Sequence, residues 1–215
     1  LLQSIDIIED EWISGKEQYR LQLKEKRELA LHLVTQFFRY PLLKDSTVNN
    51  CLRMEKAGID MVKYILAKEK NDESINDLKI DVKCEAPVLH AKLTYLNNGT
   101  LMDFADAIAS NIWMFLVSKN GDFYTSDFPI VVEPHIQNAH PMYMGLAQYG
   151  GEFTYPLSPS LMLVVYDRVY FKEKKESDCT FSIADDKEIR RQNMLRYFYA
   201  KRHVFSSKKK FSLID

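Results

Sequence analysis

The sequence contains few cysteines and no long apolar run. Its three cysteines, Cys51, Cys84 and Cys179, are an odd number and lack the spacing of metal ligands. Such cysteines are typical of buried thiols in a reducing compartment rather than of a disulfide framework. No apolar run approaches the roughly 20 residues needed to cross a bilayer, and the acidic start 1–12 lacks the basic stretch of a signal peptide. We therefore expect a cytoplasmic protein without a membrane-spanning segment.

Several motifs of cofactor and nucleophile chemistry are also missing. The sequence contains no Gly-rich phosphate loop, no Rossmann fingerprint and no Ser nucleophile elbow. It has neither a His-Glu-x-x-His helix nor paired cysteines, and His135 and His140, in a long loop predicted over 134–151, are only loosely compatible with metal binding. We therefore expect no tightly bound cofactor and no metal.

The length and composition are those of an ordinary globular protein. A chain of 215 residues, 46% hydrophobic and 27% charged, can bury a core without disulfides or metals. We expect one domain over residues 1–215. The chain begins with Leu1 rather than methionine, so we also expect that an N-terminal piece, and with it part of a functional site, has been removed.

Positive charge is concentrated at the C-terminal end. The whole chain has 29 basic and 30 acidic residues, yet residues 186–215 hold nine Lys and Arg against three acids, a local net charge of +6. Such an end can bind the phosphates of a nucleic acid by releasing counterions. A solvated helix face with a basic tail has the same sequence. Both interpretations stay open.

The hydrophobic pattern of the first half is helical. Helical spacing of apolar residues predicts helices over about 1–12, 17–40 and 46–67. Pro87 favours the start of a fourth helix, and Thr100 resembles the first residue of a capping box that begins a fifth.

The period changes to that of strands near Trp113. Strands are predicted over 113–118, 122–126, 128–132, 152–155, 161–166, 180–183 and 203–206, with a last helix over about 186–201. Asn120-Gly121 is a strong hairpin signal, since both turn positions need positive φ. We therefore predict an α+β fold, in which N-terminal helices (1–110) pack on one side of a mostly antiparallel sheet that is followed by one C-terminal helix (111–215).

A set of short motifs follows a fixed order along the chain. They are Gln36-Phe37-Phe38-Arg39-Tyr40-Pro41, Trp113, Phe123-Tyr124-Thr125-Ser126-Asp127-Phe128-Pro129, Tyr155-Pro156-Leu157-Ser158-Pro159, and Asn193 followed by Ala200, Arg202 and Val204-Phe205-Ser206. In this order they resemble the motifs of an uncharacterised bacterial family, domain of unknown function 4238. Phe128 stands where that family usually has Asn, and the His-Tyr-x-Pro stretch that usually opens the family is absent. The resemblance covers nearly the whole chain and implies no particular reaction.

The motif residues supply the main candidates for a site. Arg39 follows Phe37-Phe38 at a predicted helix end, with Gln36 one turn behind, a geometry that suits a phosphate or a carboxylate. Arg39 can equally pair with the helix C-terminus or an internal acid. Asp127 can act as a base or hold a metal, or it can close a turn by bonding to nearby backbone.

Two further candidates lie on predicted helices. His90 is either a general base or a satisfied core residue. Asn193 faces the sheet, where its amide must find partners such as a backbone carbonyl or the Thr125-Ser126-Asp127 turn, so a structural role is expected. We expect one cleft to contain all the candidates: Gln36, Arg39, His90, Asp127, Asn193 and Arg202.

Three functions are compatible with these features. The first is a nucleic-acid-acting enzyme, for example a nuclease of the phage-defence type. Its catalytic candidates are Arg39, Asp127 and His90, and its binding candidates are Gln36, Asn193 and Arg202. The alternative is a non-catalytic recognition domain whose motifs are structural. A small-molecule enzyme has the least support. Geometry distinguishes them, because an enzyme needs its ionisable groups in one pocket.

Overall fold

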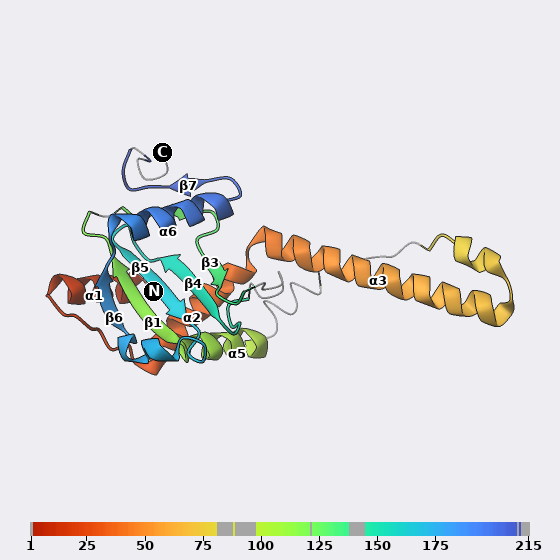
Figure 1. Cartoon of the computed structure of the whole chain (residues 1–215), viewed down its shortest axis with the longest axis horizontal. Coiled ribbons are helices and arrows are strands. Elements are labelled where there is room, and N and C mark those ends of the chain that lie inside the picture. The colour runs from red at the N-terminus through yellow and green to blue at the C-terminus, as the bar shows by residue number, and fades with distance from the viewer. Residues whose placement is uncertain are drawn as a thin grey trace. The chain divides into compact units, whose positions relative to one another are not determined.

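A computed structural model describes residues 2–80, 88, 98–120, 122–137, 145–209 and 211. The chain divides into two compact units, one formed by Leu1–Phe37 with Leu101–Asp215 and the other by Phe38–Thr100 (Figure 1). Each unit is described by itself below, and the single domain over residues 1–215 stays a prediction. No helix in the described part of the chain is long and apolar enough to cross a membrane.

The first unit is built around a five-stranded sheet with the order β3-β4-β5-β1-β6. Its strands are β1 (Ile112–Val117), β3 (Val131–Pro134), β4 (Gly151–Pro156), β5 (Leu161–Tyr166) and β6 (Thr180–Ile183). Neighbouring strands are antiparallel except β1 and β6, which are parallel. A separate two-stranded sheet pairs β2 (Thr125–Ser126) with β7 (Val204–Phe205). The predicted mostly antiparallel sheet is confirmed.

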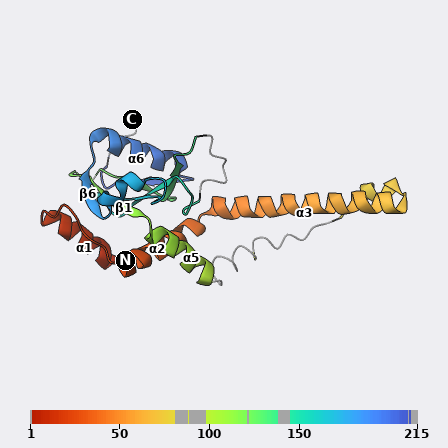
Figure 2. The same cartoon turned by 60° about the horizontal axis from the view of Figure 1, so that its bottom comes forward.

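Helices cover both faces of the five-stranded sheet (Figure 2). The helices of this unit are α1 (Leu2–Ile13), α2 (Leu23–Phe38), α5 (Asn98–Ala109), the 3-10 helix η4 (Lys172–Ser177) and α6 (Asp186–Tyr199). Tyr155 of β4 contacts His32 of α2, whereas its neighbour Thr154 contacts Arg196 of α6. Successive strand residues point to opposite faces, so α2 and α6 lie on opposite sides of the sheet. The predicted α+β fold, with N-terminal helices and one C-terminal helix, is confirmed.

The core lies on the central strands. All five residues from Leu161 to Val165 of β5 are buried, because helices cover both faces and such a strand needs no polar alternation. In β1, Trp113 is fully buried and its indole N–H donates to the Ile108 carbonyl at 3.0 Å. This hydrogen bond joins α5 to the sheet and satisfies the buried indole.

The second unit contains one long helix, α3 (Pro41–Lys70), and the 3-10 helix η1 (Glu73–Asp77). The predicted start of this helix near residue 46 is wrong, because Pro41 itself occupies the first turn, where its missing N–H is not needed. The helix ends at Asn71, whose left-handed φ of 49° closes it.

The predicted hairpin around Asn120-Gly121 is wrong. β1 and β2 belong to different sheets, since both edges of β1 are already occupied, one by β5 and the other by β6. The chain after this point therefore pairs elsewhere, and the Phe123 N–H donates to the Pro159 carbonyl at 3.0 Å.

Two predicted helix starts differ from the structure, and a third lies outside the described residues. The second helix begins at Leu23 rather than near Glu17, because the chain before it is extended and the Tyr19 N–H donates to the Cys179 carbonyl. Thr100 lies inside α5 rather than at its cap. The helix predicted to begin at Pro87 lies outside the described residues.

Candidate functional site

Asn193 ties α6 to the chain that leads into β2. Its side chain is fully buried, its Oδ1 accepts the Tyr124 N–H at 2.9 Å, and its Nδ2 donates to the Asp122 carbonyl at 2.8 Å. Each end of the amide has a partner, as burial requires. The contact clamps the backbone on both sides of Phe123 against α6.

Asp127 ties β2 to the segment that follows α6. Its Oδ1 accepts the Lys201 N–H at 3.0 Å, and its Oδ2 accepts the Arg202 N–H at 2.8 Å. The Asp127 N–H itself donates to the His203 carbonyl at 3.0 Å. Both carboxylate oxygens are thus engaged with backbone, which is the arrangement of a tether.

The hydroxyl groups of two motifs close turns. Ser126 Oγ donates to the Phe128 carbonyl at 2.7 Å and accepts the Phe128 N–H at 3.2 Å. Ser158 Oγ accepts the N–H groups of Ser160 and Leu161, each at 3.1 Å. These motif hydroxyls therefore hold local backbone.

Three motif segments meet around one small cavity of about 320 Å³. It is lined by Phe123, Thr125, Pro156, Leu157, Ser158, Pro159, Phe205, Ser206 and Ser207. Segments far apart in the sequence thus converge within the first unit. Most of the lining groups are apolar side chains or turn residues, so this cavity offers little acid–base chemistry.

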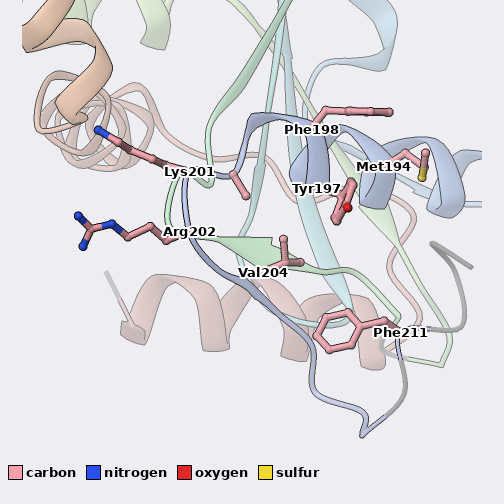
Figure 3. Close-up of a pocket in the computed structure, with 8 residues that line it drawn as sticks. Met194, Tyr197, Phe198, Lys201, Arg202, Val204 and Phe211 are labelled. Atoms are coloured by element: carbon pink, nitrogen blue, oxygen red, sulfur yellow. The ribbon is translucent and has the colours of Figure 1, made fainter.

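A larger cavity of about 790 Å³ lies between the end of α6 and the chain that follows it (Figure 3). Its lining residues are Met194, Tyr197, Phe198, Ala200, Lys201, Arg202, Val204 and Phe211, and we call it the aromatic–basic groove. Tyr197, Phe198 and Phe211 are 53%, 70% and 39% exposed. Lys201 and Arg202 come from the segment after α6, and in Figure 3 their side chains extend in the same direction, away from the rings of Tyr197 and Phe211. The groove thus combines exposed rings with positive charge.

The two tethers shape the aromatic–basic groove without lining it. Asp127 fixes the backbone of the two basic residues, as described above. Across the groove, the Phe211 ring packs edge-on against the Tyr124 ring, with 5.2 Å between the centroids. The Tyr124 backbone is in turn held by Asn193. One motif residue therefore supports each wall.

Gln36 lies in a different part of the first unit. It is half-buried and follows His32 by one helical turn, so both share a face of α2. His32 Nε2 lies 3.4 Å from the Tyr155 hydroxyl, and burial raises the pKa of Tyr155. The next residue, Phe37, packs its ring against Phe128. His32 was not a candidate from the sequence, because a single histidine in a helix carries no signal of its partner.

The remaining candidates are placed as follows. Arg202 is exposed and lines the aromatic–basic groove, Arg39 is exposed and belongs to the second unit, and His90 lies outside the described residues. Contacts join Asp127 to the backbone of Arg202, and both tethers hold the chain between 122 and 127. The convergence of all six candidates on one cleft stays a prediction.

A network of charged groups between α6 and the sheet was not predicted from the sequence. Arg191 contacts Glu133 at 2.6 Å, Glu152 at 3.2 Å and Glu188 at 3.1 Å, and Glu152 also contacts His135 at 2.8 Å. Glu133 and Glu152 are direct cross-strand partners, a destabilising pair of like charges. Arg191 offsets this repulsion. Within the described residues, no group of three His, Cys, Asp or Glu side chains is arranged to hold a metal ion.

Arg196 is fully buried beneath α6. Its Nη2 donates to Thr154 Oγ1 at 2.7 Å and lies 3.6 Å from Met162 Sδ. Within the described part of the chain, its Nε and Nη1 have no hydrogen-bond partner, and neither does Gln192 Oε1. Burial lowers the pKa of Arg196 to about 9. This guanidinium is thus destabilised where it lies.

A second charged cluster joins α2 to the sheet. Asp178 accepts hydrogen bonds from Lys26 Nζ at 2.7 Å, from the Trp113 N–H at 2.8 Å and from Arg168 at 3.1 Å. Burial favours a higher pKa for Asp178, but the bonds from Lys26 and Trp113 outweigh it and lower the pKa. The cluster stabilises the packing of α2 on β1.

The chain matches a known protein family. A family model described as "Protein of unknown function (DUF4238)" matches residues 3–210. The resemblance drawn from the motifs is confirmed. No curated protein and no solved structure matches the chain.

Proposed function

We propose that this chain, which belongs to the DUF4238 family of proteins of unknown function, is a nucleic-acid-recognition domain. The observation that carries the proposal is the aromatic–basic groove. Its exposed rings, including Tyr197 and Phe198, line the same cavity as Lys201 and Arg202. Aromatic rings stack on bases, and basic side chains neutralise phosphates while releasing counterions.

A nuclease is the other function that the motif residues suggest from the sequence. In a nuclease, Asp127 would act as a base or hold a metal ion. Both of its oxygens accept backbone N–H groups, those of Lys201 and Arg202, and this arrangement favours a tether. The structural alternative for the motifs therefore has the better support, with recognition as the function.

Binding of fluorescently labelled oligonucleotides, followed by anisotropy, tests the proposal. We expect the double variant Lys201→Ala/Arg202→Ala to weaken binding and to reduce the slope of log K against log salt by about 1.4–1.8, since each phosphate contact contributes about 0.7–0.9. The matched control is Lys172→Ala/Lys175→Ala, which removes the same charge from exposed residues of η4.

Two results would contradict the proposal. One is the absence of binding to any oligonucleotide. The other is equal weakening by both double variants, which would mean that binding depends on net charge alone. The same oligonucleotides are examined for cleavage, and cleavage that is lost in Asp127→Asn at unchanged binding would establish the nuclease instead.

A further inference from the structure

We infer that the aromatic–basic groove takes a single-stranded nucleic acid, with unpaired bases against Tyr197 and Phe211 and phosphates on Lys201 and Arg202. This inference rests on the proposed function and specifies its ligand. Three features of the groove carry it: the exposure of its rings, the small number of its cations and the support behind one ring.

The rings are open to flat ligands. Tyr197 is 53% exposed and Phe211 is 39% exposed, and they come from different segments that line the same cavity (Figure 3). A base in a duplex is covered above and below by its neighbours, so a protein ring cannot stack on it unless the base is flipped out. Unpaired bases offer both faces. Exposed rings on two walls therefore match a single strand.

Within the described residues, the groove has little positive charge for binding a duplex by phosphates alone. The described basic residues that line it are Lys201 and Arg202, and Lys208, further along the same segment, forms an ion pair with Asp122. Duplex-binding proteins that rely on phosphates make on the order of 6–10 such contacts. With fewer contacts, base stacking must supply much of the affinity, and stacking selects unpaired bases.

One ring is held in place before any ligand binds. Phe211 packs against Tyr124, whose backbone N–H donates to the buried Asn193. A ring that is already positioned loses less conformational freedom on binding. The motif residue Asn193 is thus a positioning residue for this groove, although it does not line it.

The test compares a mixed-sequence single strand, as DNA and as RNA, with the corresponding DNA duplex, each titrated with the full chain. We expect the strands to bind at least about tenfold more tightly than the duplex, since stacking of one base corresponds to roughly this factor or more. Tyr197→Ala should weaken strand binding about tenfold, and Tyr197→Phe, which keeps the ring, should bind like the wild type. The matched control is Tyr149→Ala, which removes a tyrosine of similar exposure, 55%, outside the groove.

The outcomes separate this inference from the proposed function. Duplex binding as tight as strand binding overturns the inference and leaves nucleic-acid recognition standing, whereas failure of every oligonucleotide to bind overturns both. An abasic strand bound as tightly as the normal strand, or equal effects of Tyr197→Ala and Tyr149→Ala, also overturns the inference. Melting temperatures of all variants check that each is folded, and Tyr197→Phe gives an answer even where the alanine variant is unstable.

Discussion

Replacing the buried Arg196 with methionine should stabilise the protein, although most substitutions of buried residues destabilise one. Its guanidinium is fully buried, and two of its three nitrogens have no partner within the described residues. Methionine has a similar unbranched length and can pack in the same space against Met162. The substitution therefore removes a charge that is poorly solvated while keeping most of the packing.

The expected gain in the free energy of unfolding follows from two opposing contributions. Burial lowers the pKa of Arg196 from its usual value to about 9, and a shift of that size corresponds to a cost on the order of 5 kcal/mol for the charged folded form. Methionine also gives up the hydrogen bond to Thr154, worth about 1.5–3 kcal/mol for a charged donor. We expect a net gain of roughly 1–4 kcal/mol, the range known for apolar replacement of buried ionic groups.

Chemical denaturation of wild type and Arg196→Met measures this gain, and the melting temperature should rise by about 2–4 °C per kcal/mol. The matched control is Arg191→Met, five residues before Arg196 on the same helix, where the arginine contacts three carboxylates. There the same change should destabilise the fold, because it leaves Glu152 buried beside Glu133 without that cation.

The pH dependence gives a second check on Arg196. Below about pH 9, both the folded and the unfolded chain carry the proton, so the full penalty is present. Above pH 9 the folded chain releases the proton first, and the penalty decreases as pH rises. The advantage of Arg196→Met over wild type should therefore shrink above pH 9. A loss of stability in Arg196→Met comparable to that in Arg191→Met would refute the reasoning, since it would mean that the buried guanidinium is well paired.

Three further predictions concern the tethers and the charged cluster on α2. Asn193→Ala should lower the free energy of unfolding by about 2–4 kcal/mol in urea denaturation, because it leaves two backbone groups unpaired, those of Tyr124 and Asp122; an unchanged midpoint would contradict the clamp. Asp127→Ala should cost only about 0.5–2 kcal/mol, like the loss of a helix cap, yet weaken oligonucleotide binding in anisotropy, and Asp127→Asn, which keeps one acceptor oxygen, should fall between. Asp178, whose pKa is lowered, contributes stability above about pH 4 that is lost as pH falls further. The melting temperature of the wild type should therefore fall more steeply than that of Asp178→Asn between neutral and acidic pH. Parallel plots of melting temperature against pH for the two proteins would argue against this contribution.

The parts of the fold that the sequence predicts well are those that local pattern determines. β5 and β6 have the predicted bounds, because a short apolar or β-branched run between turn residues has few alternatives. The hairpin predicted at Asn120-Gly121 is wrong because a local turn preference does not decide which strands pair. That choice depends on β1, whose two edges gain more by pairing with β5 and β6 in the buried sheet.

The candidate site was predicted only in part for a similar reason. The inward face of Asn193 follows from helical spacing, and its partners are backbone groups that lie 69 and 71 residues away in the sequence. Arg191 and Arg196 look in the sequence like solvated residues of a basic helix. The ion pairs of Arg191 depend on Glu133 and Glu152, and the hydrogen bond of the buried Arg196 depends on Thr154, all of which come from strands β3 and β4. No spacing rule connects them.

The same contacts change how the basic C-terminal segment is interpreted. Its local charge of +6 counts Arg191, Arg196 and Lys208, yet the first and last of these are paired with acids and the second is buried. The charge that this segment offers a ligand is therefore smaller than the sequence suggests, and Lys201 and Arg202 are the part of it that lines the groove. Because the Asp127 carboxylate holds the backbone of these two residues, their position depends on a motif residue that lines no groove. A motif can thus matter for binding without supplying a reactive group, and this is why activity loss in an Asp127 variant would identify a nuclease only if binding is shown to be unchanged.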